Sequence, residues 1–98
     1  MFYLMYEVHP RPTHPEYGII DGAYAGLWIN EPTQGAAELV GQTFLAECLW
    51  DVEILEEAYP VTLEQYEEGH VGRARFQQAL VDGVVCTFFR WPVGAPDE

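Results

Sequence analysis

Trp50-Asp51-Val52-Glu53-Ile54 alternates apolar and acidic side chains without a break. Successive side chains of a β-strand point to opposite faces of the sheet. The alternation therefore predicts a half-buried strand that turns Trp50, Val52 and Ile54 into the core. Asp51 and Glu53 are expected to face solvent from its other side. We expect residues 55–59 to leave this strand and the proline at position 60 to end the segment.

Two strands and a helix are expected before this segment. Residues 2–8 are rich in aromatic and β-branched side chains and predict a strand, and residues 23–29 predict a second one after a turn at Asp21-Gly22. Prolines at positions 10, 12 and 15 remove backbone donors, so the intervening chain is expected to form a rigid loop. Residues 30–33 are typical of a helix start, and apolar residues at positions 37, 40, 44 and 48 predict a helix to about Leu49.

The C-terminal part predicts two helical segments and a last strand. Thr62 and Gln65 have the spacing of a capping box, which predicts a short helix over 62–68. Phe76, Ala79 and Leu80 mark the expected buried side of a helix over 73–81. Residues 84–91 are apolar on both faces of the expected strand, which favours a central place in the sheet. Residues 93–98 are expected to form a mobile tail.

The expected order of elements is β-β-α-β-α-β over one domain, residues 1–98, without a repeat or a linker. This order predicts an α+β two-layer sandwich with a four-stranded mixed or antiparallel sheet. Both helices are expected on one face of the sheet, in a broadly ferredoxin-like arrangement.

The charge of the chain is strongly one-sided. Its 98 residues carry 16 acidic side chains and four arginines, with no lysine, for a net charge of −12. Twelve of the acids lie between Arg11 and Arg73, where no cation occurs. Such a field repels nucleic acids and anionic membranes and attracts basic proteins. The 14% aromatic content argues against a disordered acidic tail.

The sequence carries no motif for catalysis or for a cofactor. It has no serine for a serine nucleophile and no lysine for a Schiff base or a phosphate-binding loop. His9 and His14 flank the proline loop at a spacing that matches no metal site, and His70 is expected to end the short helix, its charged form favoured by nearby acids. We therefore predict no catalytic residue, no metal and no cofactor, in a protein that is not an enzyme.

Both cysteines and the start of the chain bear on its compartment. Cys48 and Cys86 lie in apolar runs and are predicted to be buried, free and unreactive. The first residues lack the pattern of a signal peptide, and no apolar run is long enough to cross a membrane. The expected setting is the cytoplasm, where thiols stay reduced.

A dense run of acids suggests a binding surface. Eight acidic side chains fall between Glu47 and Glu68. Ordinary solubilising surfaces mix both signs of charge, so this run predicts a partner-binding face, with a merely solvated face as the alternative. The predicted partner-binding residues, with the two tyrosines as anchors, are Glu47, Asp51, Glu53, Glu56, Glu57, Tyr59, Glu64, Tyr66, Glu67 and Glu68.

Two functions are compatible with these features. The first is a small non-enzymatic inhibitor or binding protein that docks its negative face on a basic, nucleic-acid-binding protein as a nucleic-acid mimic. In size and charge the chain resembles small acidic phage-encoded inhibitors and toxin-immunity proteins, which implies a basic protein partner and no direct contact with nucleic acid or membrane. The alternative is a small homodimer that binds a small or cationic ligand in an aromatic pocket. Core packing is the plainer role for the rings of that pocket, which are Tyr3, Tyr6, Tyr24, Trp28 and Trp91.

Overall fold

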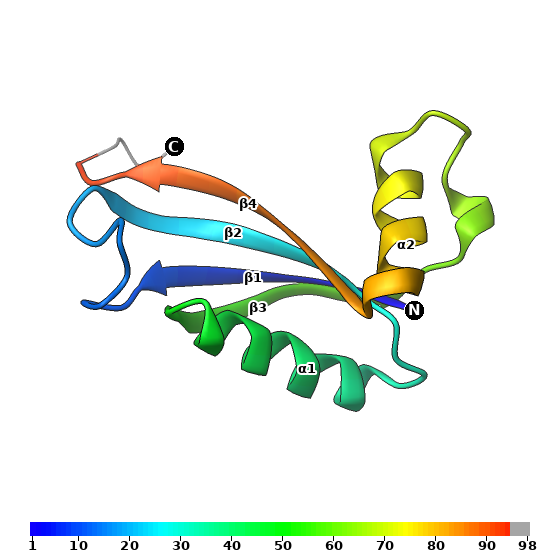
Figure 1. Ribbon diagram of the computed structural model, residues 1–98, viewed down its shortest axis with the longest axis horizontal. Coiled ribbons are helices and arrows are strands. Elements are labelled where there is room, and N and C mark those ends of the chain that lie inside the picture. Colours follow the sequence, from blue (N-terminus) through cyan, green and yellow to red (C-terminus); the bar gives the residue numbers. More distant parts are fainter. Residues whose placement is uncertain (95–98) are drawn as a thin grey trace.

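The computed structural model describes residues 1–94 and confirms the element order β-β-α-β-α-β. Four antiparallel strands form one sheet in the order β3-β1-β2-β4, with β3 and β4 at its two edges (Figure 1). The elements are β1 (Phe2–Pro10), β2 (Ile20–Ile29), α1 (Gln34–Glu47), β3 (Trp50–Pro60), the 3₁₀ turn η1 (Leu63–Gln65), α2 (Val71–Asp82) and β4 (Val84–Pro92). The α+β class is confirmed, whereas this strand order does not confirm the ferredoxin-like label.

Several predicted boundaries were wrong. β4 is an edge strand and not a central one, although its side chains are apolar on both faces. β1 continues to Pro10, whose buried ring lies opposite Trp50, so the strand predicted to end at residue 8 includes the first proline, which was expected in the loop. Asp21 and Gly22 lie within β2, and the turn precedes them. Residues 95–98 of the predicted mobile tail lie outside the described residues, and within the same predicted tail the N–H of Val93 donates to the carbonyl of Ile19 over 3.0 Å.

Helix α1 covers one face of the sheet. It begins at Thr33, whose hydroxyl accepts a hydrogen bond from the N–H of Ala36, as the sequence predicted. Its buried positions are Ala37, Gly41 and Leu45, so the buried stripe is rotated from the predicted one. The reason lies at position 41, where a Cβ would stand 3.1 Å from a methyl group of Ile29. The glycine lets the helix approach the sheet closely.

The buried core lies between α1 and this face, and strand register explains its composition. β1 and β2 form a regular antiparallel pair in which even-numbered residues of β1 lie opposite odd-numbered residues of β2. The side chains that share the face are small or aliphatic on β2 and larger on β1. This face holds Leu4, Tyr6, Val8, Ala23, Ala25, Leu27 and Ile29, and Ala37, Leu45 and Trp50 complete the cluster.

Helix α2 and the segment that leads into it lie at one end of the sheet (Figure 1). Trp28 projects away from α1, because its neighbours in β2 point into the α1 core. Its indole N–H donates to the hydroxyl of Tyr66, 3.1 Å away, and the Tyr66 ring packs against Phe76 of α2. The prediction that both helices share one face was therefore wrong. Within residues 1–94, no helix has the length and apolar character needed to cross a membrane.

Candidate functional site

Strand β3 is longer and less regular than predicted, and this decides where its acids lie. It extends to Pro60 and carries two irregularities in its pairing with β1. Val52 lies opposite Val8 and Ile54 opposite Glu7, so Glu53 has no partner and forms a bulge. Glu56 is skipped in the same way between Leu55 and Glu57. Each bulge reverses the alternation that follows it.

The first bulge overturns the prediction that Ile54 is a core residue. Beyond Glu53 the core side passes to Leu55, and Ile54 turns to the face opposite α1, where half of its surface (50%) is exposed. Trp50 and Val52 lie on the core side as predicted, with Trp50 only 2% exposed. A strictly alternating strand would have buried Ile54 and left one acid fewer in solvent.

The result is a surface that mixes carboxylates with exposed apolar groups. On the open face, residues of β3 lie opposite His9, Glu7, Met5 and Tyr3 of β1. Tyr59, which is 42% exposed, lies at one end of this row, and the exposed Ile54 lies in the middle of it. We call this the β3 surface, and its members are Asp51, Glu53, Ile54, Glu56, Glu57 and Tyr59, all of them exposed.

Few carboxylates of the β3 surface form salt bridges with basic side chains of the described residues. Arg11 donates from Nε to Asp51 over 2.8 Å in an exposed ion pair, which contributes little to stability. No other acid of this surface forms a salt bridge with a described residue. Burial, followed by the charge of Glu57, raises the pKa of the Tyr59 hydroxyl. Burial first, then Tyr59 and Glu57, raises the pKa of Tyr3 to about 12.

The remaining predicted binding residues divide into two groups. Glu64 lies in η1, and Glu67 and Glu68 follow in the turn before α2. All three are exposed. Their segment is linked to the Tyr59 end of the β3 surface through Tyr66, which bonds to Trp28, and through Tyr3, whose ring packs against both Trp28 and Tyr59.

Two predicted residues are placed less favourably for binding. Glu47 is exposed in the last turn of α1, in the layer on the other side of the sheet. Tyr66 is half-buried, with its hydroxyl bonded to Trp28 and its ring near His70 and Phe76. Its role in joining α2 to the sheet is therefore structural.

His9 stands beside the β3 surface and is held at both ring nitrogens. Its Nδ1 lies 2.8 Å from the carbonyl oxygen of Asp21, and its Nε2 lies 3.1 Å from a carboxylate oxygen of Glu7. Both partners are acceptors, so both nitrogens donate only when the ring is charged. Burial, the largest single effect, lowers the pKa of His9, but these two hydrogen bonds with the charges of Glu53 and Glu7 raise it overall. His9 was expected only to flank the proline loop, whereas it lies within β1, and no local sequence pattern pointed to its two partners.

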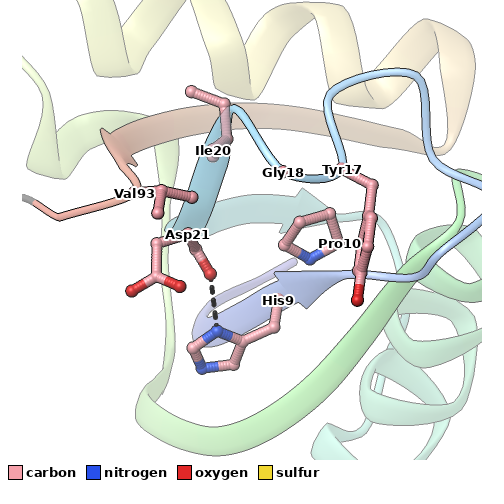
Figure 2. A pocket seen from close by; sticks show the side chains of 7 residues that line it. All are labelled: His9, Pro10, Tyr17, Gly18, Ile20, Asp21 and Val93. Atoms are coloured by element: carbon pink, nitrogen blue, oxygen red, sulfur yellow. Dashed lines mark hydrogen bonds between the residues drawn. The ribbon is translucent and has the colours of Figure 1, made fainter.

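A shallow cavity of about 300 Å³ opens next to His9, between the end of β1 and the start of β2 (Figure 2). Figure 2 shows the imidazole bonded to the Asp21 carbonyl, with Pro10, Tyr17 and Val93 around the cavity. A second cavity of about 480 Å³ lies at the start of α2, where Glu68, His70, Arg73 and Gln77 contribute polar groups. Neither cavity is lined by the aromatic rings of the predicted ligand pocket.

Those five rings separate into three places. Tyr6 lies in the α1 core, on the opposite face from the other four. Tyr3 packs edge-on against Trp28, with ring centroids 4.9 Å apart, and Tyr24 packs against Trp91 at 5.0 Å. Tyr3 lies over Gly26 and Trp91 over Gly22, so that a Cβ at either glycine would clash with the ring. The rings therefore cover bare backbone instead of lining a cavity.

The cysteines and the third histidine have modest roles. Cys48 is exposed at the end of α1, contrary to the prediction that it is buried, and Cys86 is half-buried with its pKa raised to about 12, mainly by burial. His70 does not end η1 but caps α2, because its Nδ1 accepts from the N–H of Gly72 over 2.9 Å. An accepting nitrogen carries no proton, so this contact belongs to the uncharged ring. Among residues 1–94 no cluster of metal-ligating side chains occurs.

Comparisons with families of known proteins, with curated proteins and with solved structures found no match.

Proposed function

We propose that this protein is a non-enzymatic binding protein that docks its β3 surface on the basic surface of a nucleic-acid-binding protein and blocks it. The observation that carries the proposal is the exposure of Ile54 within a row of carboxylates that have almost no cations of their own. Exposed apolar groups supply contact area, and the carboxylates supply attraction and specificity. Because both cysteines are free, we place the protein in the cytoplasm.

The charge of the β3 surface favours a basic partner. Four acids lie within the seven residues from Asp51 to Glu57, and among residues 1–94 only Asp51 of these four forms a salt bridge. A second copy of this chain that docked its own β3 surface here would bring the same carboxylates together and would be repelled. A groove that neutralises phosphates presents arginine and lysine side chains at suitable spacing, so spaced carboxylates can occupy it in place of the nucleic acid. The predicted consequence is fast association that weakens steeply with salt.

The proposal is tested with a variant that keeps shape and removes charge: Asp51→Asn, Glu53→Gln, Glu56→Gln and Glu57→Gln together. The wild-type protein, immobilised, captures proteins at low salt; those released at high salt are identified, purified and measured one by one in a biosensor. We expect the quadruple variant to associate about tenfold or more slowly with the purified partner at low salt. Excess DNA or RNA should displace the wild-type protein from it.

A matched control removes four charges elsewhere: Glu31→Gln, Glu38→Gln, Glu47→Gln and Asp82→Asn. If this control loses as much binding as the β3 variant, general charge and not the β3 surface governs association. If the quadruple variant binds and is displaced like wild type, the β3 surface is only a solvated face. Circular dichroism spectra and melting curves of both variants show whether the fold is kept.

A further inference from the structure

The two edges of the sheet differ sharply. The β3 edge carries two bulges, four acids and a terminal proline, which are features that protect an edge strand from pairing with another strand. β4 has none of these along most of its length, because its pairing with β2 runs without a shift from Val84 to Trp91. The β3 edge is therefore protected against pairing with another strand, whereas the β4 edge is regular.

The outer side of β4 makes no backbone hydrogen bonds with the described chain. Within residues 1–94, β4 bonds to β2, and the neighbouring bonds involve only Gly83, before the strand, and Val93, after it. Every second residue of an edge strand directs its N–H and C=O away from the sheet. This outer side can accept another strand.

The charge of the chain is also divided between the two edges. Residues 1–68 contain thirteen of the acids and only Arg11 as a cation. Residues 69–98 contain Arg73, Arg75 and Arg90 against Asp82, Asp97 and Glu98, so the charges of this part are balanced, and Arg90 donates to Glu16 over 3.1 Å. β4 itself has no acid, and Arg90 is its one charged residue. Phe89 projects from it on the open face with 75% of its surface exposed.

We propose that β4 pairs antiparallel with β4 of a second copy, so that one sheet continues through a homodimer. The excess of acids lies in residues 1–68, so two copies should repel each other least on the α2–β4 side, where the strand that forms the contact carries no acid. Antiparallel pairing of identical edges has its two-fold axis perpendicular to the sheet, so the contact is isologous and closes at two chains. In a register centred on Thr87, Phe89 faces Val85 of the second copy, an aromatic and β-branched pair that stabilises sheets.

This dimer is independent of the proposed function. It leaves both β3 surfaces free, at the two far edges of the joined sheet. A head-to-tail contact between β4 and the β3 edge of another copy is less favourable, because bulges interrupt the β3 ladder. Such a head-to-tail contact would also leave a free edge at each end and would produce open polymers. Added salt would dissociate them, because it screens the attraction between the charges of the two edges.

The test is sedimentation equilibrium of the full chain alone, without a partner. We expect a monomer–dimer equilibrium that persists or tightens as salt is added, since salt screens the repulsion between copies. Phe89→Glu and Phe89→Lys should each raise the dissociation constant roughly tenfold, because both symmetry-related contacts are lost at once. The control is Leu39→Glu on the outer side of α1, where the side chain is 69% exposed, and it should dimerise like wild type.

Three outcomes would overturn the inference. The wild-type chain could stay monomeric at every accessible concentration, or it could form salt-sensitive polymers larger than a dimer. Alternatively, only Phe89→Glu could weaken the dimer while Phe89→Lys leaves it intact, which would assign the effect to net charge and not to β4. Phe89 is exposed, so both variants are expected to fold, and circular dichroism checks this.

Discussion

The rings of Trp50 and Phe88, from the two opposite edge strands of the sheet, stack on each other with their centroids 5.2 Å apart and 22° between their planes. Edge strands of a flat four-stranded sheet would stand three spacings of about 4.8 Å apart. The two rings reach inward on the α1 face over the small side chains of Ala23 and Ala25. His14 adds a third ring, 4.4 Å from Trp50. This cluster closes the core beyond the end of α1.

Truncating Trp50 is expected to remove a large part of the stability of the domain. Trp50→Ala should lower the free energy of unfolding by about 3–5 kcal/mol, the usual cost for a buried tryptophan. Phe88→Ala should cost less, because Phe88 is only partly buried. Chemical denaturation of the two single variants and the double variant gives their coupling, which should favour the pair by about 0.5–1.5 kcal/mol. Strictly additive losses would mean that the stack contributes nothing of its own.

The prediction for Tyr6 runs the other way. Its side chain is 1% exposed, and its hydroxyl makes no hydrogen bond with a described residue. A buried hydroxyl without a partner costs about 1–3 kcal/mol. Tyr6→Phe should therefore leave the free energy of unfolding unchanged or raise it by up to about 1 kcal/mol, and Tyr24→Phe on the exposed face is the control. A clear loss of stability in denaturant titrations would show that the hydroxyl is bonded, with Gln42 as the candidate, since that side chain lowers the pKa of Tyr6 while burial raises it.

The sequence predicted the element types correctly because each one has a local signal. Thr33 and the capping box of Thr62 and Gln65 act within a few residues, and the N–H of Thr62 does donate to the side chain of Gln65 over 2.7 Å. Strand order depends instead on contacts between distant segments, which no local pattern encodes. The link from α1 to β3 was also not encoded by a local pattern. Leu49 has a φ of 69° there, a conformation that usually calls for glycine.

The β3 surface was predicted in part, and the error at Ile54 has a physical cause. The first five residues of β3 alternate, so a period of two predicts burial of Ile54. The core residues of the strand are Trp50, Val52, Leu55 and Ala58, and their spacing changes from two to three. That change was the available signal for the two bulges. The signal was missed because both bulge residues are glutamates, and an inserted acid adds no apolar side chain that would reveal the change in spacing.

The bulges can be tested by comparing two neighbouring positions of β3. Val52→Ser introduces a hydroxyl on the core side and should lower the free energy of unfolding by about 1–3 kcal/mol. Ile54→Ser lies on the open face and should cost less than about 1 kcal/mol, well below the cost for a buried isoleucine. Thermal melts of both variants separate the cases. Equal losses at the two positions would indicate a regular strand with Ile54 in the core.

The last prediction concerns pH and His9. The pKa of His9 in the folded protein lies above its ordinary value of 6.5, because Asp21 and Glu7 accept from both ring nitrogens and outweigh the effect of burial. A raised pKa means that the folded protein binds this proton more tightly than the unfolded chain. The stabilisation is therefore complete below pH 6.5 and is lost as the pH rises through the folded value. Denaturant titrations should show the wild-type protein losing more stability than His9→Gln on going from below pH 6.5 to mildly alkaline pH. His14→Gln is the control, because the Nδ1 of His14 accepts from the N–H of Glu16 and does not require a charged ring. If wild type and His9→Gln lose the same amount over that range, the ring is neutral in the folded protein and one of its two contacts is not a hydrogen bond.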